Sequence, residues 1–233
     1  MQLRNHDSEV DEDLTQLVRV GGRCSYVLLA LLSLILLYPY VIEWAWGRLV
    51  LVAMASCIFV AIAYAIGRSR QRLIAGSFFA VALLGLQWTY LATGDRLIFG
   101  VGVAVFLLFM VFAIAQLFGY LMRHGPVTAD KLHAALAVYV LGAFLWAGLY
   151  TLLNHINPGS FLVNTARGSL LDFYDMLYFS FTTLTSVGYG DLTPATRRAE
   201  SMVILEQIAG VFYVAVLIAR LAGLYPPGAD RSK

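Results

Sequence analysis

Residues 182 to 191 read Thr-Thr-Leu-Thr-Ser-Val-Gly-Tyr-Gly-Asp. Two glycines, Gly188 and Gly190, flank a tyrosine, and a short apolar segment leads into the stretch. Glycine has no Cβ atom, so it adopts backbone angles that other residues avoid. A ribbon with glycines at these places can turn its backbone carbonyl oxygens toward one axis. The pattern therefore predicts an irregular ribbon here, rather than a helix or a strand.

The composition of the 233-residue chain is that of an integral membrane protein. Hydrophobic residues make up 60% of the chain and charged residues only 13%, whereas a soluble domain carries about 25% charged residues. The formal net charge of +2 is too small to indicate a nucleic-acid partner. We therefore expect an all-α membrane protein with membrane lipids around it and no nucleic acid.

The hydrophobic segments predict six membrane-spanning helices and one shorter helix. A spanning helix needs about 20 mostly apolar residues. Six segments meet this length, at roughly 24–42, 49–66, 73–91, 97–122, 132–153 and 200–224. The apolar piece at 173–185 is too short to span, at about 20 Å of helix. Irregular backbone at membrane depth is tolerated only where it lines a cavity, so we interpret this piece as a re-entrant helix that leads into the ribbon.

The distribution of positive charge predicts the orientation, because cytoplasmic loops carry an excess of Lys and Arg. With the N-terminal side placed inside, eleven of these residues lie inside and five outside. The inside set is Arg4, Arg19, Arg23, Arg68, Arg70, Arg72, Arg123, Lys131, Arg220, Arg231 and Lys233. The outside set is Arg48, Arg96, Arg167, Arg197 and Arg198. We expect both termini in the cytoplasm and the glycine-containing ribbon open to the outside.

The chain divides at the connection between the fourth and fifth spans, where Gly125-Pro126 ends one helix. Thr128 or Asp130 is a candidate cap for the next helix. The predicted parts are a cytoplasmic tail at 1–23, a four-helix bundle at 24–123 (the front bundle), a cytoplasmic linker at 124–131, a pore module at 132–224 and a short cytoplasmic tail at 225–233.

The ten-residue stretch and its flanking helices resemble the pore of the tetrameric potassium channels. The resemblance covers about residues 132 to 224 and implies a homotetramer, because one chain supplies one ribbon and a ring of carbonyls needs four. In this family the ring replaces the water shell of a K⁺ ion. The resemblance implies that the filter loop, residues 185–190, binds K⁺ through Thr185, Ser186, Val187, Gly188, Tyr189 and Gly190. Ser186 stands where threonine is usual.

The resemblance also implies residues that support the filter loop from behind. Tyr178 and Phe179 match an aromatic cuff, and Tyr178 can bond the carboxylate of Asp191. Thr182 occupies a position that is glutamate in some relatives, so a pair of carboxyl groups is not expected there. Asp172 can cap the short helix, with Asp175 in its first turn, since acids are favoured at a helix N-terminus.

The last span contains a glycine that invites an explanation, because glycine inside a helix costs about 1 kcal/mol relative to alanine. Gly210 matches the gating-hinge position of the family, and a close helix contact is the alternative. The resemblance places Val211, Val214 and Ile218 along the cavity below the filter. Glu206 lies inside hydrocarbon, where a charge is expensive. We expect it to bond hydroxyls of the short helix or to be protonated, acting as a brace or as a proton sensor.

Four helices before a pore module resemble voltage-gated channels in topology only. A voltage sensor needs repeated arginines in its fourth helix, and residues 97–122 contain no Lys or Arg. The resemblance of the pore module implies a K⁺-selective, passive channel of the plasma membrane, and the missing arginines imply that voltage does not gate it directly. Its predicted partners are three further copies of the chain and lipid. No enzymatic motif or cofactor site is expected. A non-selective cation channel and a silent subunit that needs a partner remain alternatives.

Overall fold

A computed structural model describes residues 22–67, 69–123, 129–164 and 171–223. Six long helices occupy most of these ranges, together with one short helix and two three-residue strands. In chain order they are α2 (Arg23–Val41), α3 (Gly47–Ile66), α4 (Arg70–Thr93), α5 (Arg96–Leu121), α6 (Ala129–Ile156), β1 (Phe161–Val163), α7 (Phe173–Leu184), β2 (Leu192–Pro194) and α8 (Arg197–Gly223). The predicted tails and the capping role of Thr128 lie outside the described residues.

All six long helices are long and apolar enough to cross a membrane. This confirms the predicted all-α membrane fold, and each helix end lies within about three residues of its predicted position. Local signals that the sequence carries explain several ends. Ser69 and Asp95 cap the N-termini of α4 and α5 through their side chains, and Gly94 ends α4 with a φ of 66°, which glycine adopts readily.

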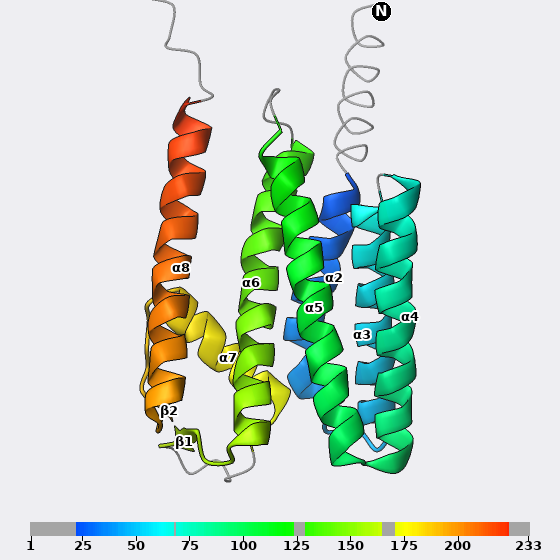
Figure 1. Cartoon of the computed structure of the whole chain (residues 1–233), viewed down its shortest axis with the longest axis vertical. Helices are drawn as coiled ribbons and strands as arrows, with labels where there is room; N and C mark the ends of the chain where they lie inside the picture. The colour runs from blue at the N-terminus through cyan, green and yellow to red at the C-terminus, as the bar shows by residue number, and fades with distance from the viewer. Residues whose placement is uncertain (1–21, 68, 124–128, 165–170, 224–233) are drawn as a thin grey trace, which may run out of the picture.

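The short helix α7 lies obliquely between α6 and α8, at the end of the molecule where β1 and β2 lie (Figure 1). The α2–α3 and α4–α5 turns, the end of α6 and the start of α8 lie at this same end. These are the segments that the charge distribution assigns to one side of the membrane. The arrangement is the one that a re-entrant helix requires, since α7 starts near this end and the chain returns to the same end at β2 (Figure 1).

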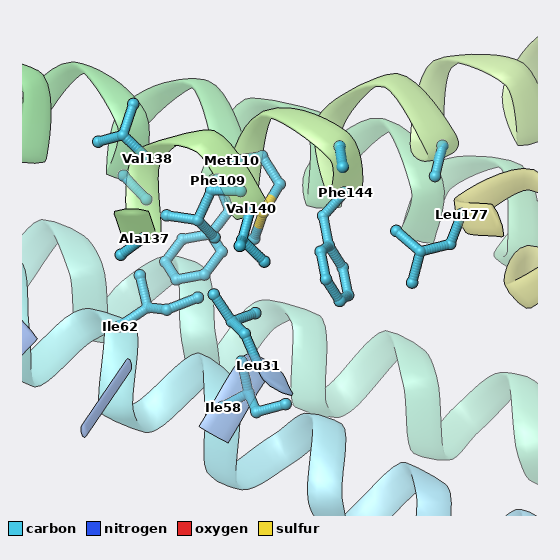
Figure 2. Close-up of a cluster of buried hydrophobic side chains, with 14 of the residues drawn as sticks. Leu31, Ile58, Ile62, Phe109, Met110, Ala137, Val138, Val140, Phe144 and Leu177 are labelled. Carbon is cyan, nitrogen blue, oxygen red and sulfur yellow. The ribbon is translucent and has the colours of Figure 1, made fainter. Parts of the chain in front are cut away.

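The front bundle packs on its own pore module within the single chain. Helices α2 and α5 pack along α6, and one hydrophobic core runs through both parts. Figure 2 shows side chains of this core from the front bundle and the pore module facing one another. They include Leu31, Ile58, Ile62, Phe109, Met110, Val138, Phe144 and Leu177.

The candidate cap Asp130 serves a different helix from the one predicted. It lies in the first turn of α6, and its carboxylate accepts a hydrogen bond from the backbone N–H of Cys24 at 3.2 Å and from the Tyr120 hydroxyl at 2.8 Å. Cys24 is in the first turn of α2, where backbone N–H groups lack partners within the helix. Asp130 therefore stabilises the N-terminus of α2 and ties it to the start of α6.

Candidate functional site

The short helix α7 is fixed at its N-terminus by a reciprocal pair of hydrogen bonds. The Asp172 carboxylate accepts from the Asp175 backbone N–H at 2.9 Å, and the Asp175 carboxylate accepts from the Asp172 N–H at 3.0 Å. Two N–H groups that have no partner within the helix are thereby satisfied. The structure thus contains the cap that the sequence predicts, and it fixes the direction in which α7 points.

A tyrosine of the front bundle joins this cap. The Tyr38 hydroxyl of α2 donates to the Asp172 carboxylate at 2.6 Å. Its ring also stacks on Tyr174 with a centroid separation of 4.3 Å and an interplanar angle of 1°. Offset or stacked aromatic pairs of this kind stabilise a contact beyond the area that they bury. Sequence reasoning did not identify Tyr38, because 134 residues separate it from its partner.

The chain turns back on α7 as soon as the helix ends. Three successive amides, those of Ser186, Val187 and Gly188, donate hydrogen bonds to the last turn of α7. The Thr183 carbonyl accepts the first at 2.9 Å, and the Thr182 carbonyl accepts the other two at 2.8 and 3.1 Å. In a trans peptide the C=O group points opposite to the N–H group of the next residue. The three carbonyls that precede these amides therefore point away from α7 on one side.

The backbone of the filter loop has a positive φ at every second residue. The φ angles are 59° at Ser186, 53° at Gly188 and 76° at Gly190. The two glycines take this conformation without a steric cost, as the sequence predicts. Ser186 was not predicted to do so, and it is the one residue other than glycine with a positive φ among those described. Non-glycine residues with this angle are uncommon, and at Ser186 it occurs together with hydrogen bonds from its own N–H and from the next two N–H groups to α7.

Tyr178 of α7 contacts the outer part of the filter loop and the residue that follows it. Its hydroxyl donates to the Asp191 carboxylate at 2.9 Å, and its ring is nearly parallel to Tyr189 with centroids 6.5 Å apart. Phe179 is buried and packs on Tyr150 and Phe161 instead, at 5.3 and 5.6 Å. Of the two predicted cuff residues, Tyr178 therefore contacts the filter loop and Asp191, whereas Phe179 packs against α6 and β1.

Two hydroxyl groups near the end of α7 donate hydrogen bonds to backbone carbonyls of the same helix. Thr185 donates its hydroxyl proton to the Phe181 carbonyl at 2.7 Å, and Thr182 donates to the Phe179 carbonyl at 2.9 Å. A hydroxyl that donates still has lone pairs that accept. The Thr185 oxygen therefore keeps the capacity to face a cation.

The outer end of the filter loop is next to a pair of short strands that sequence reasoning missed. Strands β1 and β2 pair antiparallel, with Val163 opposite Leu192. Directly after β1, the Asn164 side chain donates to the Gly190 carbonyl at 2.9 Å and to the Thr193 hydroxyl at 3.1 Å. A strand of three residues shows no usable alternation in the sequence, and a single asparagine in a loop gives no signal of its own.

Glu206 is completely buried, with 0% of its surface exposed. Its carboxyl group accepts hydrogen bonds from the Ser180 hydroxyl of α7 at 2.5 Å and from the Tyr150 hydroxyl of α6. The Ser180 oxygen also lies 2.9 Å from the Ala143 carbonyl of α6. A buried polar group is costly unless it is bonded, and this one is bonded on two helices. The structure therefore contains the bond to a hydroxyl of the short helix that the sequence predicts, and Glu206 joins α6, α7 and α8.

Gly210 lies directly against the last turn of α7. A Cβ atom at this position would stand 2.4 Å from the Leu184 carbonyl oxygen. The Tyr139 hydroxyl donates to the same oxygen at 3.4 Å. This is the close helix contact that sequence analysis left open as the alternative to a hinge. The hinge role stays a prediction, as does the position of Val211, Val214 and Ile218 along a cavity; all three are exposed in the single chain.

Removing the cap of α7 tests how firmly this helix is held. We expect Asp172→Ala to lower the free energy of unfolding by about 1–2 kcal/mol, because an N-cap acceptor is lost together with the partner of Tyr38. Asp172→Asn is the matched control, since asparagine caps as well as aspartate does. Thermal unfolding of the purified protein in detergent measures both. Equal losses for the two variants would show that the cap does not hold α7.

Part of the chain is similar in sequence to known proteins. Residues 135–225 match the model of a family described as "Ion channel". "Two pore potassium channel c" of Oryza sativa subsp. japonica is 34% identical over 94 residues, which are 39% of this chain and 18% of that protein. "Probable potassium channel protein 2" of Methanocaldococcus jannaschii is 33% identical over 63 residues, which are 27% of this chain and 18% of that protein. No solved structure matches significantly.

The matched segment is the part of the chain that contains α7, the filter loop and α8. This segment is less than half of the chain; its similarity to an ion channel family and to two potassium channels supports a potassium channel family, and the six apolar helices indicate a membrane protein. The chain spans about a fifth of the length of these two relatives. An ion channel family points to a transport role rather than an enzymatic one.

Proposed function

We propose that four copies of this chain form a channel that conducts K⁺ selectively and passively across the plasma membrane. One observation carries the proposal: three successive N–H groups are bound to the end of α7, so the carbonyls of Thr185, Ser186 and Val187 point together to the other side. Carbonyl rings of this kind replace the hydration shell of K⁺. We extend the site through Gly188, Tyr189 and Gly190, as the resemblance implies.

The single chain presents the surfaces that such an assembly would cover. Val187 and Tyr189 of the filter loop are 52% and 71% exposed. Helix α8 also exposes a long series of large apolar side chains, among them Ile204, Leu205, Ile208, Val211, Phe212, Val216 and Ile218. A homotetramer places some of these against neighbouring copies and the others against lipid or along the ion path.

The end of α7 supports the cation further. The C-terminal end of a helix carries a partial negative charge, and this end of α7 lies at the base of the filter loop, beside Gly210. Four such ends around one axis would stabilise a cation below the filter. We further propose that the filter end faces outside and that both termini are cytoplasmic, in keeping with the excess of Lys and Arg at the other end.

Reconstitution of the purified chain alone in liposomes tests the proposal. The expected result is a K⁺ efflux down its gradient that Na⁺ cannot replace, with protein-free liposomes as the control. Equal Na⁺ and K⁺ fluxes would instead indicate a non-selective cation channel. An assembled protein without any flux would indicate a silent subunit that needs a partner.

The proposed channel should respond weakly to voltage. No Lys or Arg lies between the ends of α5, and each elementary charge that crosses the membrane contributes about 2.3 kcal/mol per 100 mV. We expect the open probability to change by less than about threefold per 100 mV, since one full charge would give about fiftyfold. Single-channel recording over both polarities measures this. A steep voltage dependence would contradict the proposal that the front bundle is not a voltage sensor.

A further inference from the structure

Asn164 reaches from the end of β1 to the outer end of the filter loop. Its side-chain amide donates to the Gly190 carbonyl at 2.9 Å and to the Thr193 hydroxyl at 3.1 Å. Its backbone N–H donates to the Asp191 carbonyl at 2.7 Å. These bonds span 26 to 29 residues of sequence, so a position in one loop controls the geometry of another.

The pairing of the two strands explains why an asparagine fits here. Val163 is opposite Leu192, and the Asn164 backbone continues the ladder by one step to Asp191. The Asn164 side-chain amide supplies a further donor, to the Gly190 carbonyl. An amide NH₂ group has two hydrogens to donate, and both have an acceptor, Gly190 and Thr193.

The peptide between Gly190 and Asp191 is otherwise easily rotated. Gly190 has a φ of 76°, and a glycine permits many alternative backbone angles. The inner half of the filter loop is bound to α7 through its N–H groups, up to Gly188. The outer end is held by two side chains: Asn164 bonds the Gly190 carbonyl and Tyr178 bonds the Asp191 carboxylate, each at 2.9 Å.

We propose that Asn164 is a positioning residue that keeps the outer end of the filter in its conducting conformation. It does so by holding the Gly190 carbonyl, which restricts rotation of the Gly190–Asp191 peptide and so fixes the backbone of the outer filter. The inference rests on the proposed K⁺ channel function and adds a residue of the loop before α7 to the filter machinery.

The test compares variants that differ in one bond. Asn164→Asp keeps the shape of the side chain, but its carboxylate cannot donate to the Gly190 carbonyl. Asn164→Ala removes the bond without adding a charge. Thr193→Val is the matched control, because it removes only the second acceptor and leaves the bond to Gly190 in place. All are made in the full chain and checked for the same assembly size as the wild type.

Two measurements follow. The first is the K⁺ concentration that half-maximally raises the thermal stability of the protein in detergent against a Na⁺ background, because an ion that binds the folded state stabilises it. The second is the rate at which K⁺ current declines when external K⁺ is lowered. In Asn164→Asp and Asn164→Ala, loss of the hydrogen bond to the Gly190 carbonyl should raise the half-maximal K⁺ concentration and the rate of current decline by about five- to tenfold. High K⁺ should restore the current, and Thr193→Val should stay within about twofold of the wild type.

The outcomes separate the two proposals. A wild type that K⁺ stabilises no better than Na⁺, and that does not select K⁺, overturns the proposed function. A selective wild type with unchanged Asn164 variants overturns the role of Asn164 alone. Equal effects of Thr193→Val and Asn164→Ala would assign the effect to general anchoring of the loop and would also overturn it. So would failure of both Asn164 variants to assemble, since Asn164 would then be needed for folding.

Discussion

Replacing Glu206 with leucine should lower the free energy of unfolding by about 3 kcal/mol or more. The carboxyl group is fully buried and accepts from hydroxyls on two other helices. Leucine fills much of the space but leaves the Tyr150 hydroxyl without this acceptor, at a cost of about 1–3 kcal/mol. Two hydrogen bonds to a carboxyl group are lost as well. Ser180 keeps its contact with the Ala143 carbonyl, so its loss should be the smaller one.

Denaturant or thermal unfolding of the assembled protein measures the effect. Glu206→Gln is the matched control, because it keeps the length of the side chain and an acceptor oxygen, and we expect it to lose less than half as much. The triple variant Glu206→Leu, Tyr150→Phe, Ser180→Ala should recover part of the loss, because it leaves neither hydroxyl buried without a partner. A Glu206→Leu protein as stable as the wild type would show that this residue does not brace the three helices.

Replacing Gly210 with alanine should damage both stability and conduction. A Cβ atom would stand 2.4 Å from the Leu184 carbonyl, which is backbone and cannot turn aside as a side chain can. Relief of this overlap must move α8 or the last turn of α7, at a cost of about 1–3 kcal/mol. Because Thr185 follows Leu184 directly, the shift reaches the base of the filter. We expect the K⁺ flux in liposomes to fall about tenfold or more, in line with that cost.

Gly85→Ala is the control for this prediction. Gly85 lies inside α4, and its added Cβ atom would meet no atom within 4 Å. Alanine there should leave the flux unchanged and stabilise the helix by up to about 1 kcal/mol. The pair also separates the two explanations of Gly210. A hinge alone predicts that Gly210→Ala is at least as stable as the wild type, whereas the close contact predicts that it is less stable.

The parts of the fold that depend on local sequence were predictable. A run of about 20 apolar residues is sufficient to indicate a spanning helix, and all six were found. The short helix was predicted with Asp172 as its cap and Asp175 in its first turn, because acids are favoured at a helix N-terminus. The reciprocal bond that the Asp175 carboxylate accepts was not predicted. The partner of Tyr178 and the bond of Glu206 to a hydroxyl of α7 were also anticipated. Those interpretations, however, used the resemblance to a family or the cost of a charge in hydrocarbon.

The contacts that sequence reasoning missed all join distant segments. Tyr38 meets Asp172, Asp130 meets Cys24, and Asn164 meets Gly190. Tyrosine, aspartate and asparagine are common near helix ends and in loops, so the sequence does not indicate that any of these residues has a partner 26 or more residues away. The positive φ of Ser186 was missed for a related reason. It occurs where three successive N–H groups bond α7, and it runs against the preference of the residue itself.

Two contacts between side chains and distant partners join the front bundle to the pore module. Tyr38 of α2 bonds the capping residue of α7, and Arg220 near the other end of α8 lies 2.9 Å from the Met122 sulfur and donates to the Arg123 carbonyl at 3.4 Å. Both ends of the pore module are therefore attached to the helices that precede it.

Current recorded through single channels under opposed K⁺ and Na⁺ gradients tests the central claim most directly. If the carbonyls of four filter loops surround the ion path, the current should reverse near the equilibrium potential of K⁺, whatever the Na⁺ gradient. A reversal that follows Na⁺ as closely as K⁺ would contradict the account.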